Sequence, residues 1–114
     1  MPTQNQQKTV ADAIDAIRCA ENLLTDQIQS STDTLTAIKL THEYNNLDSF
    51  LSELLHAQNA ADDVTFTNAT QALRSRISGL KADEVAINRI IKDVAVAGKI
   101  VKCVTQALGF IAKL

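Results

Sequence analysis

The chain has 114 residues, of which 46% are hydrophobic and 21% are charged, and its formal net charge is −2. This size fits one domain spanning residues 1–114, and the apolar content excludes a disordered chain. With three glycines and a single proline at position 2, the sequence lacks the breakers of a turn-rich β fold, so helices are favoured.

The cysteine content and the first residues bear on the cellular compartment. Cys19 and Cys103 are too few for a disulfide framework, and the N-terminal residues lack the charged and apolar regions of a secretory signal peptide. We therefore expect an intracellular, cytoplasmic protein. Both cysteines are expected to be buried, inert thiols, because a reactive cysteine needs a histidine or a cationic neighbour.

Charge divides unevenly between the two halves of the chain. Residues 1–63 carry three bases against ten acids, a net charge of −7, whereas residues 64–114 carry eight bases against three acids, a net charge of +5. This pattern favours an acidic half that packs beside a basic half, within one bundle or in an antiparallel pair of chains. A basic surface for nucleic acid or anionic lipid is the alternative. Aromatic residues are only 4% of the chain, so we expect no nucleic-acid binding.

A first helix is predicted over residues 8–29. Its apolar residues recur at spacings of three, four and seven, as they do on one face of a helix. These residues are Val10, Ile14, Ile17, Leu24 and Ile28. The polar residues 1–7 are predicted to fray, although Thr3 followed by Gln6 has the form of a capping box.

A second helix is predicted over residues 33–60, because residues 29–33 are rich in types that cap helices. Its main apolar stripe consists of Leu40, Tyr44, Leu47, Leu51 and Leu54. A second apolar face carries Leu35, Ile38 and His42, which predicts a semi-buried histidine and two neighbouring elements. The alternative is a long helical hairpin or coiled coil in which the first and second helices are continuous.

Two further helices are predicted over 64–78 and 82–113, with a glycine stop at Gly79 between them. Asp62 or Asp63 is predicted to cap the third helix. Apolar residues cover most of the circumference of the fourth helix, so most of its surface requires burial. The sequence therefore predicts an all-α domain, an antiparallel four-helix bundle in which the fourth helix is the most buried.

The C-terminal segment 94–114 contains three lysines and no acid, which gives it a charge of +3. Lys99 and Lys102 interrupt the apolar run before it reaches the length of a transmembrane span, so no bilayer crossing is predicted. Such a helix can be central in a bundle, form an oligomer interface, or lie on a membrane surface.

Motifs for metal binding or catalysis are weak. His42-Glu43 begins like a zinc-protease signature, but Asn46 stands where the second histidine is required. Glu53 and His56 have the Glu-x-x-His spacing of di-iron bundles, and a site built from them needs a homodimer, because the chain holds no second copy of the motif. We expect no enzymatic activity and no cofactor, and a dimeric metal enzyme is the third hypothesis.

The sequence predicts a non-enzymatic interaction or structural module that binds itself or another protein through the apolar C-terminal helix. Two apolar faces on one helix exceed what a single core requires. The predicted interaction residues, with the lysines at the rim, are Lys99, Val101, Lys102, Leu108, Phe110 and Ile111. The second hypothesis is a membrane-docking or membrane-active protein in which the helix 94–114 lies on anionic lipid.

Overall fold

The computed structural model describes residues 2–114, which form five α-helices and, within that range, no strand. The helices are α1 (Gln4–Ser30), α2 (Thr34–Gln58), α3 (Asp63–Ser75), α4 (Ile77–Ile90) and α5 (Val94–Ala112). The predicted all-α helical bundle is confirmed, with five helices in place of the predicted four.

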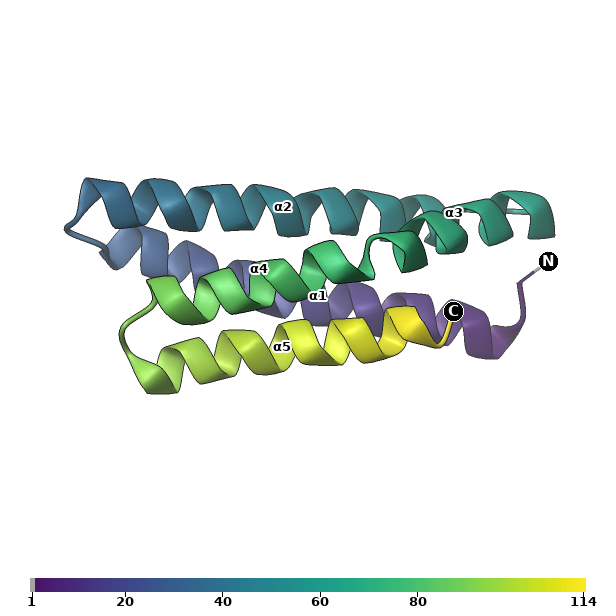
Figure 1. The fold of residues 1–114 in the computed structure, drawn as a ribbon. Coiled ribbons are helices and arrows are strands. Elements are labelled where there is room, and N and C mark those ends of the chain that lie inside the picture. Colours follow the sequence, from purple (N-terminus) through teal and green to yellow (C-terminus); the bar gives the residue numbers. More distant parts are fainter. Residues whose placement is uncertain (1) are drawn as a thin grey trace.

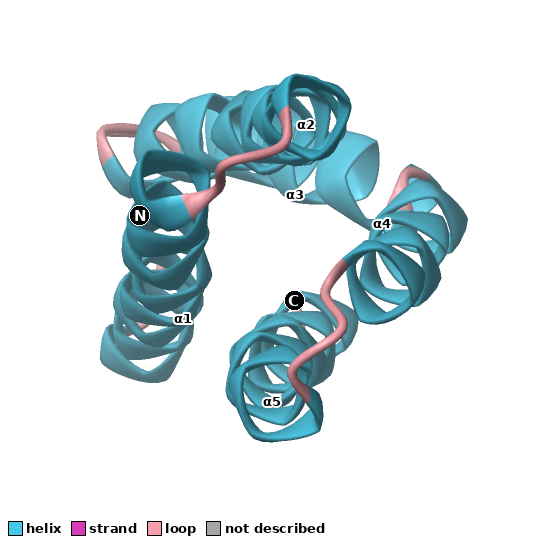
Figure 2. Ribbon diagram, turned by 90° about the vertical axis from the view of Figure 1, so that its left-hand side faces the viewer, coloured by secondary structure: helices cyan, strands magenta, loops and turns pink. Residues whose placement is uncertain are grey.

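The helices form an elongated bundle with extents of 48 × 21 × 21 Å (Figure 1). α2 runs antiparallel to α1, α3 and α4 together return along α2, and α5 runs back beside α1 and α4. Seen from one end, α1, α2, α4 and α5 surround a common centre, and the α1–α2 and α4–α5 connections lie at that same end (Figure 2). The first and last helices of the chain are therefore neighbours.

The core is one cluster of apolar side chains to which all five helices contribute. The stripes predicted for the first two helices supply much of it: Val10, Ile17, Leu24, Leu47 and Leu54 are fully buried. Each such side chain contributes about 1.5–3 kcal/mol relative to an exposed position. Helical periodicity therefore identified the inner faces of α1 and α2 correctly.

Polar caps explain where most of the helices begin. Thr3 and Gln6 form the predicted capping box at the start of α1, which begins at Gln4. Asp33, Asp62 and Asp93 each accept hydrogen bonds from backbone N–H groups in the first turn of α2, α3 and α5. Substituting such a cap by alanine typically costs about 1 kcal/mol. The predicted restart near Asp33 is confirmed, and a continuous helix through the first two elements is excluded.

The predicted fourth helix over 82–113 is wrong, because it is divided between α4 and α5. Asp93 caps α5, and Ile91 has extended backbone angles that end α4. Apolar residues continue at helical spacing across this break, and the connection contains neither glycine nor proline. Periodicity therefore concealed the boundary.

The predicted glycine stop is also wrong. α4 runs through Gly79, and no glycine within residues 2–114 has a positive φ. The break lies at Arg76, which separates α3 from α4 by a single residue. A side-chain network at Arg76, described below, links this junction to α2.

The second apolar face predicted for α2 is not covered by any neighbouring helix. Leu35 is 58% exposed, Ile38 is 60% exposed, and His42 is exposed as well. The prediction of a semi-buried His42 is therefore wrong. The neighbours of α2 cover the side that carries Leu40 and Leu47 and leave the opposite side of its first turns in solvent.

Candidate functional site

A disulfide joins the first and last helices through Cys19 on α1 and Cys103 on α5, whose Cα atoms lie 6.1 Å apart. Cys103 is only 7% exposed, whereas Cys19 is an exposed residue. The prediction of two buried, inert thiols is wrong. The two cysteines are 84 positions apart, and helical spacing within one element carries no information about which residue of a distant helix it will face.

Small residues bring α1 and α5 together around this bond. Ala16 and Ala20 flank Cys19 along α1 and are buried, while Val104 and Ala107 follow Cys103 on α5 and are fully buried. Short side chains at a helix contact allow the two backbones to approach closely. The disulfide therefore lies at the edge of the α1–α5 contact, with Cys103 on the side of the core and Cys19 on the side of the surface.

Two shallow grooves flank the disulfide on the outer surface. One groove is lined by both cysteines together with Leu23, Lys99, Lys102 and Gln106. The other is lined by Asp12, Asp15, Ala16, Cys19, Gln106 and Phe110. Because Cys19 and Gln106 line both grooves, the two form one continuous surface. We call the surface made by the residues of both grooves the α1/α5 face.

Charge is polarised along the α1/α5 face. Lys99 and Lys102 are exposed at one end, and Asp12 and Asp15 lie at the other. Asp12 is ion-paired within α1 with Lys8, at 2.9 Å between Nζ and Oδ2. Within residues 2–114, no ion pair joins Lys99, Lys102 or Asp15 to another side chain of the chain. These charges are therefore directed to solvent.

Three of the six predicted interaction residues belong to the α1/α5 face, namely Lys99, Lys102 and Phe110. Val101 is half-buried outside it, and Leu108 is half-buried against the core. Ile111 is fully buried in the core, so it is not available to a partner in this fold. Sequence reasoning did not select the α1 residues of the face, because it could not tell which helix lies beside α5.

Small residues also mark the outer surface of α5. Exposed positions there include Ala95, Gly98, Gly109 and Ala112. A Cβ atom added at Gly98 or Gly109 would meet nothing within 4 Å. No helix of the described chain therefore uses the close approach that these glycines permit.

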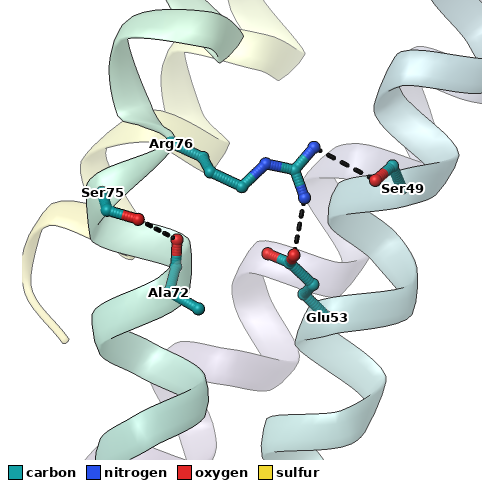
Figure 3. A network of polar contacts seen from close by, with 5 residues as sticks. All are labelled: Ser49, Glu53, Ala72, Ser75 and Arg76. Carbon is teal, nitrogen blue, oxygen red and sulfur yellow. Dashed lines mark hydrogen bonds and ion pairs between the residues drawn. The ribbon is translucent and has the colours of Figure 1, made fainter.

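Glu53 belongs to a polar network between α2 and the α3–α4 junction (Figure 3). Arg76 donates from Nη1 to Glu53 Oε1 at 2.6 Å and from Nη2 to Ser49 Oγ at 3.1 Å. The guanidinium also lies 4.5 Å from the centre of the Phe50 ring, in cation–π contact. Glu53 is thus ion-paired with Arg76, whereas His56, the other residue of the Glu-x-x-His motif, is exposed. Within residues 2–114, no group of three or more histidine, cysteine or acidic side chains is placed to hold a metal ion.

Buried carboxyl groups lie between the helices. Burial, together with a hydrogen bond to Asp48, raises the pKa of Glu21 to about 7. Burial and the neighbouring Asp83 raise the pKa of Glu43 to about 7. Asp83 accepts a hydrogen bond from Asn46 Nδ2 at 3.1 Å, and burial raises the pKa of this carboxyl as well. Burial in an apolar environment disfavours the charged form, so these groups hold protons more tightly in the folded chain.

One of these buried acids has a signal in the sequence. Glu21 stands at an inward position of the helical repeat between Ile17 and Leu24, where an apolar residue is expected. It is 5% exposed, and its Oε2 atom has no hydrogen-bond partner. An acid at an apolar position of a helical stripe therefore indicated a buried carboxyl.

α5 is long and apolar enough to cross a membrane when judged by length and composition alone, a criterion that core helices of soluble proteins also meet. In this fold six of its residues are buried in the bundle. No protein family, curated protein or solved structure matches the chain. The assignment of function therefore rests on the α1/α5 face and its side chains.

Proposed function

We propose that the protein is a non-enzymatic helical module that associates with a second copy of itself through the α1/α5 face. The observation that carries this proposal is the arrangement of charge, with Lys99 and Lys102 at one end of the face and Asp12 and Asp15 at the other. Two copies of such a face are complementary when the lysine end of one lies against the aspartate end of the other.

A two-fold axis that lies in the interface plane, perpendicular to the axis of α5, produces this arrangement. The lysine pair of each copy then faces the aspartate pair of the other copy, and the same attraction occurs twice, as in an isologous dimer. The two α5 helices run antiparallel across the interface. Attraction between opposite charges sets the orientation and the rate of association more than the affinity.

Packing at the margin of such an interface, beside the residues that line the α1/α5 face, is supported by the small residues of α5. Gly98 and Gly109 leave open space at their surface, so a helix of the second copy can approach the backbone closely. Phe110 is half-buried in the groove and offers an apolar side chain to the partner. Aromatic side chains are enriched among the residues that dominate interface energies.

Charge across the whole chain favours the same arrangement. The basic half has a net charge of +5 and the acidic half −7, yet within residues 2–114 Arg76–Glu53 is the one ion pair that joins them. Lys99, Lys102 and Asp15 of the α1/α5 face, which form no ion pair within residues 2–114, therefore remain available for pairing between copies.

Membrane docking through the segment 94–114 is the second candidate, supported by its three lysines and lack of acids. That mode requires α5 to expose Ile100, Val104 and Ile111, which are fully buried. It also requires α5 to leave α1, to which the disulfide ties it. The bundle therefore favours the dimer.

A charge-swap experiment tests the dimer. Sedimentation at low salt is expected to show that Lys99→Glu/Lys102→Glu and Asp12→Lys/Asp15→Lys are each monomeric, because each places like charges opposite one another. Mixing the two variants restores both attractions and is expected to give a heterodimer. As a matched control, Lys81→Glu/Arg89→Glu changes exposed charges of α4 by the same amount and is expected to leave the wild-type dimer intact.

A wild-type protein that is monomeric at every concentration and salt overturns the proposal, and so do two variants that do not combine when mixed. If the monomer floats with anionic vesicles at low salt and Lys99→Glu/Lys102→Glu does not, membrane docking replaces it.

A further inference from the structure

We infer that the Cys19–Cys103 disulfide is a thiol-exchange site, which takes an anionic low-molecular-mass thiol onto Cys19 as a mixed disulfide. The inference goes beyond self-association and does not depend on it. It rests on three observations: the unequal exposure of the two cysteines, the lysines around them, and the packing that holds α1 and α5 together without the bond.

Unequal exposure selects the sulfur that is attacked. Cys19 is exposed and lines both grooves of the α1/α5 face, whereas Cys103 is 7% exposed and lines one. A thiolate that attacks a disulfide must reach one sulfur while the other departs. Solvent access therefore makes Cys19 the site of attack and Cys103 the leaving group.

The lysines favour both the incoming thiol and the departing one. Lys99 lies one helical turn before Cys103, Lys102 precedes it directly, and both line the groove that contains the two cysteines. Cations beside a cysteine stabilise its thiolate, so they assist the departure of Cys103. They also attract an incoming molecule that carries carboxylates, which therefore approaches from this groove and not from the neighbouring one that holds Asp12 and Asp15. Leu23 adds an apolar wall to the same groove.

The exchange balances without any further oxidant. The incoming thiolate donates an electron pair to Sγ of Cys19, the protein S–S bond breaks, and its electron pair leaves on Sγ of Cys103 as a thiolate. The product is a mixed disulfide at Cys19. A second molecule of the thiol then attacks the small-molecule sulfur, which releases a small symmetric disulfide and leaves Cys19 as a thiolate. The protein disulfide is the oxidant for the two thiols.

Helix packing keeps the site in place when the bond is open. α1 packs as extensively against α5 as it does against α2, and Ala16, Ala20, Val104 and Ala107, which lie near the cysteines along these two helices, are buried. This packing holds α1 beside α5 when the bond is open, and a return of the Cys103 thiolate onto Cys19 reverses the reaction. In the cytoplasm, the predicted location of this protein, disulfides are typically transient because reducing systems keep thiols reduced.

Exchange and self-association compete for the same surface. A second copy seated on the α1/α5 face covers Cys19, so the thiol reacts with the monomer. The resulting adduct places a negatively charged group at the centre of the face, where it opposes docking of the second copy.

The test compares an anionic thiol, thioglycolate, with a cationic thiol, cysteamine, at equal thiolate concentration and at protein concentrations where the monomer dominates. After alkylation, peptide mapping by mass spectrometry is expected to find the adduct on Cys19 and the alkyl group on Cys103. At low salt the anionic thiolate is expected to react about threefold to tenfold faster, and high salt is expected to remove that preference. Circular dichroism is expected to show that the helices persist throughout.

Charge variants locate the cause of the preference. Lys99→Glu/Lys102→Glu is expected to abolish or reverse it, whereas the control Lys81→Glu/Arg89→Glu is expected to retain it. An adduct on Cys103, equal rates for the two thiols at low salt, or loss of helix before the bond opens each overturns the inference. The mapping uses the wild-type protein, so a variant that fails to fold does not leave the question open. A monomeric wild type that forms the Cys19 adduct supports exchange and refutes only the dimer.

Discussion

Arg76 donates a hydrogen bond to Glu53 at 2.6 Å and thereby ties the α3–α4 junction to α2. Both side chains are about one-third exposed, and the guanidinium also binds Ser49 and lies over the Phe50 ring. The second carboxylate oxygen, Oε2 of Glu53, is buried without a partner. Removal of the cation therefore leaves a carboxylate with much of its hydration lost and no compensating contact.

We expect Arg76→Met to lower the free energy of unfolding by about 1–3 kcal/mol, because a partly buried acceptor loses its charged donor. Lys8→Met is the matched control, since it removes the exposed ion pair with Asp12 and is expected to cost less than about 1 kcal/mol. Urea denaturation of both variants measures the difference. Equal losses would show that the network at Arg76 contributes no more than a surface pair.

Opening the Cys19–Cys103 disulfide is expected to destabilise the protein without unfolding it. The bond closes a loop of 84 positions, and a disulfide typically contributes about 2–4 kcal/mol, chiefly through the unfolded chain. Thermal unfolding of the wild type with and without a reductant, beside Cys19→Ser/Cys103→Ser, measures this loss. The reductant is expected to leave the melting temperature of the double variant unchanged, and a shift there would point to an effect unrelated to the bond.

Stability is expected to fall as pH rises from about 5 to 8. Burial raises the pKa of Glu21 and Glu43 from 4.5 to about 7 in the folded chain, so the native state binds more protons than the unfolded state across this range. The contribution of these two protonated groups to the free energy of unfolding is fully present below pH 4.5 and is lost as pH rises through 7. Glu21→Gln is expected to weaken this dependence of stability on pH and to raise the melting temperature at pH 8. Asp26→Asn, at an exposed position, is expected to leave the pH dependence unchanged. A wild-type melting temperature that rises between pH 5 and 8 would contradict this account.

Loss of the Asp93 cap is expected to destabilise the start of α5. Asp93 accepts hydrogen bonds from the N–H groups of Ala95 and Val96, and Asp93→Ala is expected to cost about 1 kcal/mol. Asp26→Ala, in the interior of α1, serves as the control and is expected to change the stability by less. Amide hydrogen exchange should show faster exchange of Ala95 and Val96 in the Asp93 variant, and unchanged protection there would argue against the cap.

Two glycines offer a matched pair for the proposed interface. Gly79 on α4 and Gly109 on α5 are both exposed and helical, and a Cβ atom added at either would meet nothing within 4 Å. Substitution by leucine is expected to stabilise the monomer by about 0.5–1 kcal/mol in each case, because glycine is a poor helix former. Only Gly109→Leu is expected to weaken the dimer, as measured by sedimentation. Equal dimer affinities for the two variants would place the interface elsewhere.

Local sequence determined α1, α2, the start of α3 and much of the core, whereas the boundaries of α4 were missed. The inward positions of α1 and α2 follow from the helical spacing of residues such as Ile17 and Leu47, and the starts of α1, α2 and α3 follow from caps at Thr3, Asp33 and Asp62. These features depend on residues within a few positions of one another, where spacing and hydrogen-bonding capacity can be read directly. Lys99, Lys102 and Phe110 of the α1/α5 face were predicted as interaction residues from the same kind of local pattern.

Tertiary packing alone decided which faces meet. Leu35 and Leu40 are both apolar, yet Leu35 is 58% exposed and Leu40 is 1% exposed, because neighbouring helices cover only one side of α2. Cys19 meets Cys103, and Asp15 shares a surface with Lys99, only because α5 packs antiparallel against α1. Helical periodicity gives the direction of each side chain around its own axis, whereas the position of one axis relative to another comes from burial summed over the whole chain. The candidate site lies between two helices, and for that reason it emerged only in the folded structure.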